Sequence, residues 1–106
     1  MDTNTLKKDF NKFKTDLLSL NQYMYKNPEL GYQEIKSVQK ITSLINKNVP
    51  GAKFNKFTKI PTAFTASINE NTKNKNIAIC IEYDALPNIG HACGHNLISS
   101  IGLGAF

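Results

Sequence analysis

The segment IAICIEYD, residues 77–84, decides the fold expected for this chain of 106 residues. Its first part, Ile77 to Ile81, is a continuous apolar run, which is typical of a strand covered on both faces in an α/β sheet. Polarity returns abruptly at Glu82, Tyr83 and Asp84, so these residues are expected at the carboxyl end of a central strand. In open α/β sheets that edge is where ligands bind.

Upstream of this segment, apolar residues at spacings of three and four predict an amphipathic helix from about Thr5 to Lys26. Asn27-Pro28 ends it, because a residue before proline is pushed out of helical geometry. The apolar residues that form its stripe are Leu6, Phe10, Phe13, Leu17, Leu20 and Met24.

A second, shorter helix is predicted next, and the turn-forming residues 48–51 end it. Its apolar stripe consists of Ile35, Val38, Ile41 and Ile45, with Leu44 beside it. Both helices are expected to face a sheet.

Shorter strands are predicted between the second helix and the central strand. Residues 52–57 are only weakly patterned, whereas Phe64, Ala66 and Ile68 alternate as in a half-buried strand. The polar residues 69–76 are predicted to form an exposed loop.

After the central strand, Asn96 is expected to cap a third helix that begins at Leu97 and carries Ile98, Ile101 and Ala105 at helical spacing. The chain ends at Phe106 without a helix stop signal. The sequence thus predicts an α/β fold with two helices, then strands, truncated in a third helix.

Charge and composition argue against several classes of protein. All thirteen basic residues are Lys and are scattered, so the net charge of +5 disfavours a nucleic-acid reader, which would rely on Arg. No apolar run approaches the ~20 residues of a membrane span, and no signal peptide is recognisable, so a cytoplasmic location is expected. In a reducing compartment Cys80 and Cys93 are expected as thiols or ligands rather than as a disulfide.

The loop GHACGHN, residues 90–96, carries the strongest chemical signal. His91, Cys93 and His95 alternate with small residues, and imidazole and thiolate are common ligands of zinc and similar metals. The spacing permits coordination without proving it. A buried thiol and a polar loop histidine remain the alternative interpretation.

Two carboxylates, Glu82 and Asp84, precede this loop, and residues two apart share one side of a strand. One of them could hold a ligating imidazole in its tautomer by a hydrogen bond. A solvated strand end is an equally open interpretation, and Tyr83, on the other side, is expected to pack.

Residues 82–96, EYDALPNIGHACGHN, resemble the metal-site signature of metallopeptidase family M20, in its amidohydrolase and aminoacylase branch. Two further stretches agree with this resemblance. NPELGYQE (27–34) is similar to the segment between the branch's first two helices, and PTAF (61–64) is similar to its early strand. With Asn96 in place of the more common Asp, the match is to the subgroup of aminobenzoyl-glutamate hydrolases and related dipeptidases.

The resemblance implies that residues 1–106 are part of a zinc-exopeptidase-like catalytic domain, without the family's inserted dimerisation and lid domain. By position, Cys93 and His95 would be the first two ligands of a site that holds two divalent ions, zinc or manganese. Glu82, Asp84 and His91 are expected to support these ligands, and no catalytic base is expected before Phe106. The resemblance further implies that the full-length family acts on N-acyl amino acids or dipeptides and forms homodimers.

We therefore expect the N-terminal portion of a metallo-amidohydrolase, inactive as this chain alone. The alternative is a non-catalytic metal-binding or interaction fragment that another chain completes. A basic nucleic-acid-binding domain is a third hypothesis, and it predicts salt-sensitive binding.

Overall fold

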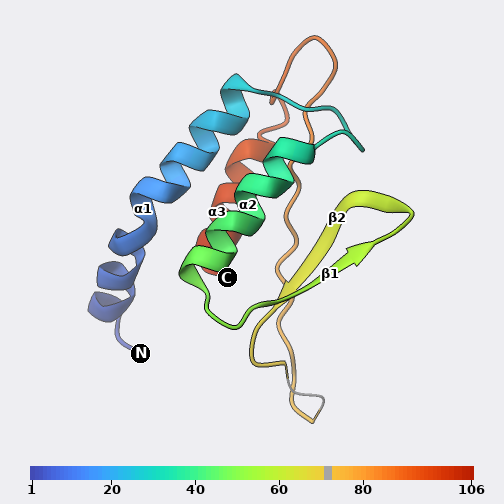
Figure 1. Cartoon of the computed structure of the whole chain (residues 1–106). Helices are drawn as coiled ribbons and strands as arrows, with labels where there is room; N and C mark the ends of the chain where they lie inside the picture. The colour runs from blue at the N-terminus through green and yellow to red at the C-terminus, as the bar shows by residue number, and fades with distance from the viewer. Residues whose placement is uncertain (71–72) are drawn as a thin grey trace.

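The computed structural model describes residues 1–70 and 73–106, which form an α/β arrangement of three helices and a two-stranded antiparallel sheet (Figure 1). The predicted α/β class is confirmed at this level. The helices are α1 (Thr3–Lys26), α2 (Ile35–Asn48) and α3 (His95–Ala105), and the strands are β1 (Lys53–Phe57) and β2 (Ile60–Ser67).

Helix α1 confirms the prediction for residues 5–26, except that it begins two residues earlier. Asp2 is the reason, because its carboxylate accepts a hydrogen bond from the backbone N–H of Thr5 at 2.7 Å and so caps the first turn. At the other end, the backbone N–H of Asn27 donates to the carbonyl of Tyr23, and Pro28 follows.

Helix α2 begins at Ile35, the first residue of the predicted stripe, and ends at Asn48, where the predicted exit turn begins, but only part of the stripe is buried. Ile41 and Ile45 lie in the core, whereas Ile35 is 60 % exposed, so its assignment to the buried face was wrong. The fully buried Ser37 takes the inward position in the first turn. Its hydroxyl and backbone N–H both donate to the Glu29 carboxylate, at 2.7 Å each, and this interaction fixes which face of the first turn points inward.

The predicted short strands form the hairpin of β1 and β2. Its register runs from the pair Lys53 and Ser67 to the pair Phe57 and Ile60, with an irregularity after Lys56. Phe64 and Ala66 pack against the core as their alternation predicts. Ile68 lies beyond the end of β2 and is exposed, so the half-buried pattern stops one step earlier than expected.

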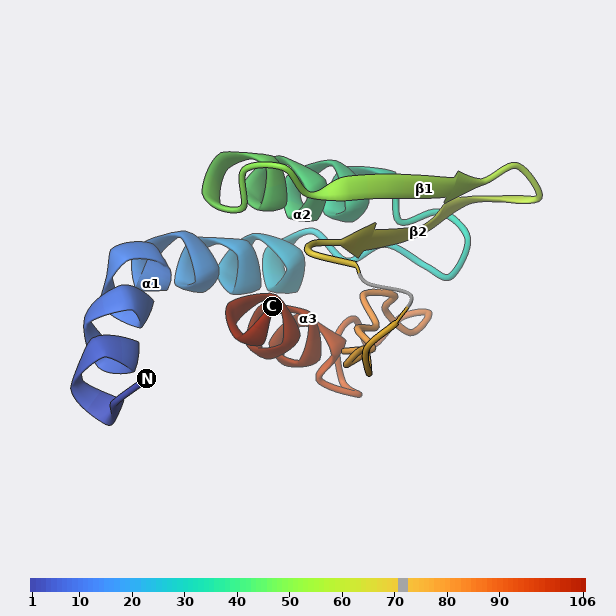
Figure 2. The ribbon, with the colours of Figure 1, turned by 90° about the horizontal axis from the view of Figure 1, so that it is seen from below.

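The core lies where the three helices pack together, with the hairpin beside α2 (Figure 2). Leu20 and Met24 of α1 meet Ile41 and Ile45 of α2, and all four are nearly or fully buried. Partly buried residues of β1, β2, α3 and the segment before Asp84 cover this cluster. No described helix is both long enough and apolar enough to cross a membrane.

The central strand predicted for residues 77–81 is not formed. This segment is extended but belongs to no strand, and Ile77 is 93 % exposed. A strand buried on both faces needs neighbouring strands, and the only sheet among the described residues pairs β1 with β2. Of the apolar run, Ile81 alone packs against the core cluster. The predicted loop at residues 69–76 is exposed in its described part, while residues 71 and 72 lie outside the described residues.

Helix α3 begins at His95 rather than Leu97, and Asn96 is not its cap. Gly94 occupies the cap position with a φ of 77°, a left-handed conformation that suits glycine. The side chain of Asn96 is instead buried and donates to the side-chain oxygen of Asn21 on α1 at 2.8 Å.

The buried face of α3 is not the face that carries the predicted apolar stripe. Ile98 and Ile101 are exposed, and the buried residues of the helix are small or polar, namely Asn96, Ser99, Ser100 and Gly102. Small residues fit this face because the neighbouring segment packs closely against it: a Cβ atom added at Gly102 would collide with the Ile81 side chain. Spacing alone identifies a helix here, but it does not show which face is covered.

Candidate functional site

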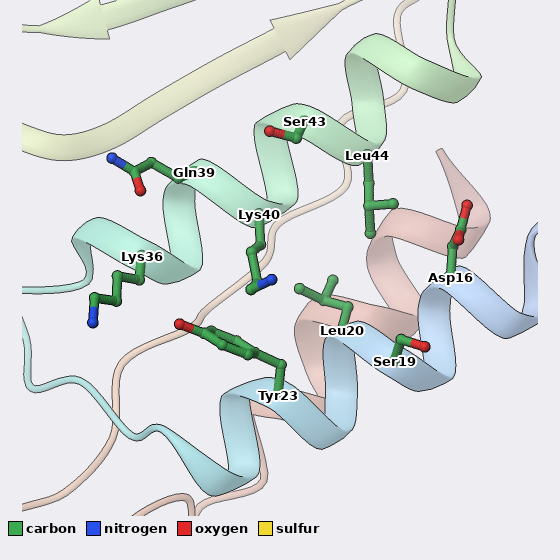
Figure 3. A pocket seen from close by; sticks show the side chains of 9 residues that line it. All are labelled: Asp16, Ser19, Leu20, Tyr23, Lys36, Gln39, Lys40, Ser43 and Leu44. Atoms are coloured by element: carbon green, nitrogen blue, oxygen red, sulfur yellow. The ribbon is translucent and has the colours of Figure 1, made fainter.

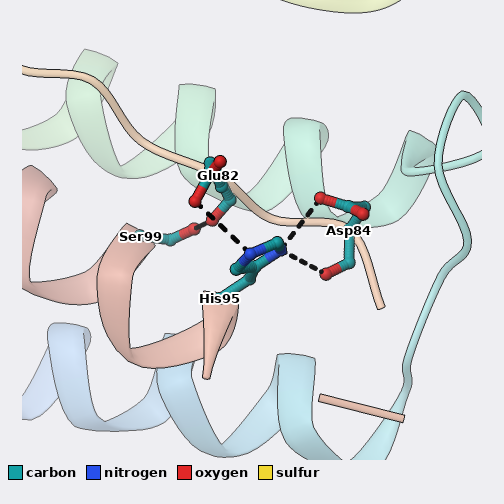
Figure 4. Close-up of polar contacts among 4 residues, drawn as sticks. All are labelled: Glu82, Asp84, His95 and Ser99. Atoms are coloured by element: carbon teal, nitrogen blue, oxygen red, sulfur yellow. Dashed lines mark hydrogen bonds and ion pairs between the residues drawn. The ribbon is translucent and has the colours of Figure 1, made fainter. Parts of the chain in front are cut away.

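His95, the first residue of α3, reaches back to the extended segment before the loop (Figure 4). Its Nδ1 lies 2.9 Å from a carboxylate oxygen of Asp84 and 2.9 Å from the Asp84 carbonyl oxygen. Its Nε2 lies 3.3 Å from Oε2 of Glu82. The structure thus brings together three of the five predicted site residues.

The tautomer of His95 follows from these partners. Both neighbours of Nδ1 are oxygen acceptors without a proton, so Nδ1 carries the hydrogen and donates it to Asp84. In the neutral imidazole this leaves a lone pair on Nε2, as in the carboxylate–histidine pairs that support metal sites.

Ser99 is a member of this cluster that the sequence prediction missed. It is fully buried on α3 and its hydroxyl donates to the carbonyl oxygen of Glu82 (Figure 4). His95 and Ser99 are four residues apart on one helix, so they share a face and clamp the same extended segment. That spacing is the signal in the sequence that could have indicated Ser99.

His91 is nine-tenths buried, and neither of its ring nitrogens has a hydrogen-bond partner among the described residues. Burial lowers the pKa of His91, and nearby His95 lowers it further, while Asp84 acts in the opposite direction. A buried imidazole without a partner is unusual and indicates a missing polar or charged neighbour.

Cys93 is a free and exposed thiol, and among the described residues no hydrogen bond joins it to His95. Cys80 is likewise free and exposed. Within residues 1–70 and 73–106, no three His, Cys, Asp or Glu side chains are arranged to hold one metal ion. This result concerns groups of three side chains, so the role of Cys93 and His95 as a pair of metal ligands stays a prediction.

The loop before α3 is held by backbone hydrogen bonds. Leu86 and Gly90 exchange two of them, with Asn88 and Gly90 in left-handed conformations that turn the chain. The N–H of Gly94 donates to the carbonyl of His91 at 3.0 Å and turns the chain into α3. The loop is therefore an ordered turn that positions His95.

The other two motif stretches lie against this segment. The N–H of Ala85 donates to the Glu29 carbonyl at 2.8 Å, so residues 27–34 lie beside residues 82–86. The Tyr83 hydroxyl donates to the carbonyl of Thr62, and its ring stacks with Phe64 at 6.2 Å between centroids. Burial, with a contribution from Glu34, raises the pKa of Tyr83 to about 12. The expectation that Tyr83 packs is confirmed.

A separate open groove runs between α1 and α2 (Figure 3). Lys40 lies over the Tyr23 ring there, with Nζ 4.1 Å from the ring centroid. The groove's lining residues, labelled in Figure 3, include no member of the His95 cluster. The two features are therefore distinct.

Comparison with known proteins gives several hydrolases, although no protein-family model matches the chain. The chain is 33 % identical over 97 residues to a Xaa-Arg dipeptidase from Homo sapiens, a match that covers 82 % of this chain and 22 % of the relative. It is 28 % identical over 103 residues to an N-acetyldiaminopimelate deacetylase from Oenococcus oeni, over 83 % of this chain and 27 % of the relative.

A third relative is a thermostable carboxypeptidase 2 from Saccharolobus solfataricus, 26 % identical over 105 residues, with 86 % of this chain and 26 % of the relative covered. The chain thus spans about a quarter of the length of these curated relatives. The matches point to the same family that the motif at residues 82–96 resembles. The chain therefore belongs to the peptidase and amidohydrolase family M20.

Proposed function

We propose that this chain contributes the first metal ligands of a hydrolase that cleaves small amides, either N-acyl amino acids or dipeptides. The domain to which it belongs is of the zinc-exopeptidase type. The observation that carries the proposal is the His95 imidazole, whose Nδ1 is held by Asp84 and whose Nε2 faces the Glu82 carboxylate at 3.3 Å. The names of the relatives, a dipeptidase and a deacetylase, support the two substrate classes.

The side chains near His95 fit a divalent ion by their chemistry. Imidazole, thiolate and carboxylate are the groups that bind zinc. The two ring nitrogens of His91, which lack a hydrogen-bond partner in the described part of the chain, fit a charged neighbour that is part of the site. Cys93 and His95 are the proposed ligands, and Asp84 and His91 support them. Glu82 and Ser99 fix the backbone from which Asp84 projects.

Each residue of this chain has a definite task in such a site. Asp84 keeps the proton of His95 on Nδ1, which fixes the tautomer and orients the ring so that Nε2 carries the lone pair. Ser99 holds the Glu82 backbone against α3, so the distance between ring and carboxylates is set by the helix. A bound divalent ion would polarise the amide carbonyl and lower the pKa of a water molecule.

We expect no turnover by the 106 residues alone. The carboxylates of Glu82 and Asp84 both contact His95, so both are engaged in holding the ring rather than placed as a general base for a water molecule. The measurement is release of free amino acid from N-acetyl amino acids and dipeptides by the purified, metal-loaded chain. Turnover that is lost in His95→Ala would contradict this expectation.

Metal binding tests the proposal directly. Calorimetric titration with Zn²⁺ should show one-to-one binding that His95→Ala abolishes and that Cys93→Ala weakens. Cys80→Ala is the matched control, because Cys80 is also a free and exposed thiol. Absence of binding by the wild-type chain, or equal loss in Cys80→Ala and Cys93→Ala, would count against the proposal.

The second candidate function is a non-catalytic fragment completed by another polypeptide. Large exposed apolar side chains favour it, notably Ile77 and the outer face of α3 with Leu97 and Ile101. It predicts stable association with a second chain, measured as a change of mass in solution by light scattering. A strictly monomeric chain that binds zinc tightly would favour the first proposal instead.

A further inference from the structure

His95 and Glu82 face each other through two electron-rich atoms when the His95 ring is neutral. Nδ1 of His95 donates to Asp84, so Nε2 of the neutral ring presents a lone pair. Facing it at 3.3 Å is a carboxylate oxygen of Glu82, which is also electron-rich. Two such atoms repel unless a positive charge lies between them, supplied by a second proton on the ring or by a cation.

The separation of the two atoms fits a shared metal ion. Ligands about 2.0–2.2 Å from a tetrahedral zinc ion lie about 3.4 Å from one another. The observed 3.3 Å between Nε2 and Oε2 agrees with that spacing.

We infer that Glu82 is itself a metal ligand, and that its Oε2 binds a divalent cation together with Nε2 of His95. This inference rests on the proposed metal-dependent function and deepens it, because Glu82 moves from a supporting position to direct coordination. Since no three such side chains converge among the described residues, this chain supplies a two-ligand half-site in the arrangement observed.

Two features of the chain support the inference independently of that distance. The backbone of Glu82 is anchored to α3 by Ser99, whereas its side chain is 62 % exposed, so the carboxylate can be reached by an ion from solvent. His91 interacts electrostatically with His95 and Asp84, and within residues 1–70 and 73–106 its two buried ring nitrogens have no hydrogen-bond partner, which indicates that a polar neighbour is missing there.

The variant Glu82→Gln tests the assignment, because it keeps the size of the side chain and removes its charge. Since Glu82 is exposed, the fold should be retained, and circular dichroism checks this. Titration with Zn²⁺, and with Co²⁺ followed by its visible absorption, should show a loss of affinity above the about 10- to 100-fold that loss of a supporting partner costs, and a changed Co²⁺ spectrum. Glu70→Gln, at an exposed glutamate in another part of the chain, is the matched control and should bind as wild type.

The outcomes separate this inference from the function on which it rests. If Glu82→Gln binds metal as tightly as wild type while His95→Ala does not, Glu82 is not a ligand and the proposed function stands. If the wild-type chain binds neither ion, both fail.

A nitrogen NMR spectrum of the metal-free chain tests the proton alternative. Signals of a doubly protonated His95 ring at neutral pH, unchanged on adding Zn²⁺, would show an ordinary ion pair with Glu82 and overturn the inference. A shift of the His95 Nε2 signal on adding Zn²⁺ to the wild-type chain, with no such shift in Glu82→Gln, would support the inference that Glu82 is a ligand.

Discussion

At the scale of single residues, Asp84 decides the state of the His95 ring. Its carboxylate oxygen accepts a hydrogen bond from Nδ1, 2.9 Å away, which leaves the lone pair of the neutral ring on Nε2. In Asp84→Asn the amide oxygen can still accept this hydrogen bond, but the negative charge is lost. We expect metal affinity to fall about 10-fold, the lower end of the range for supporting partners, because the Asp84 carbonyl still contacts Nδ1.

Calorimetric titration of Asp84→Asn with Zn²⁺ measures this effect. Asp9→Asn, at an exposed carboxylate that pairs with Lys12 on α1, controls for the loss of one negative charge. Equal affinity in wild type and Asp84→Asn would show that the carboxylate has no part in preparing the ring.

The residues of the cluster were only partly predictable from the sequence. Glu82, Asp84 and His95 could be identified because they stand in one short motif, whose spacing is read directly. Ser99 was missed and Asn96 was given the wrong role, because both act through contacts with segments distant in sequence. The ligand role of Cys93 stays a prediction, since spacing does not fix where an exposed thiol points.

At the scale of elements, the helices could be predicted and the central strand could not. Helices satisfy their backbone hydrogen bonds within a continuous segment, so the patterns of α1 and α2 were sufficient. A strand depends on neighbours, and residues 77–81 have none in the described sheet despite their apolar run. Helix α3 shows the intermediate case, since its existence followed from spacing while its buried face depended on the fit of Gly102 against Ile81.

The N-terminus of α2 provides a prediction at this scale. Glu34, at the cap position, makes no capping hydrogen bond with its side chain, and Glu29 accepts the N–H groups of Lys36 and Ser37 instead. Burial raises the pKa of Glu29, but these hydrogen bonds, with that from the Ser37 hydroxyl, outweigh it and leave the pKa lowered. Glu29→Gln should lower the free energy of unfolding at neutral pH by about 1 kcal/mol, as for loss of a cap.

The dependence on pH has a definite sign. A carboxyl with a lowered folded pKa stabilises the fold above its unfolded value of 4.5, and this contribution is lost as the pH falls through the folded pKa. Urea unfolding of wild type and Glu29→Gln should therefore differ at neutral pH and converge in acid. A constant difference at all pH values, or an equal effect in Glu70→Gln, would contradict the capping role.

At the scale of the whole molecule, the chain leaves much apolar surface in contact with solvent. Ile77 and Ile79 are exposed along the unpaired segment, and Leu97 and Ile101, the latter 70 % exposed, line the outer side of α3. Ile79 lies against α3, because its side chain is within 4 Å of the position of a Cβ atom added at Gly102. Apolar surface of this kind favours binding to another apolar surface.

We expect this surface to bind the dye ANS and to cause concentration-dependent association of the chain. Replacing both exposed residues, as in Ile77→Thr with Ile101→Gln, should reduce dye fluorescence and association while leaving the core unchanged, because neither side chain contributes to it. Ile89→Thr, at an exposed loop position outside the unpaired segment and α3, is the matched control. The measurements are dye fluorescence and light scattering over a range of protein concentrations. The expectation would be contradicted if the wild-type chain stayed monomeric and did not increase ANS fluorescence. An equal reduction of fluorescence and association in Ile89→Thr would likewise show that residues 77–79 and the outer face of α3 are not the surface that associates.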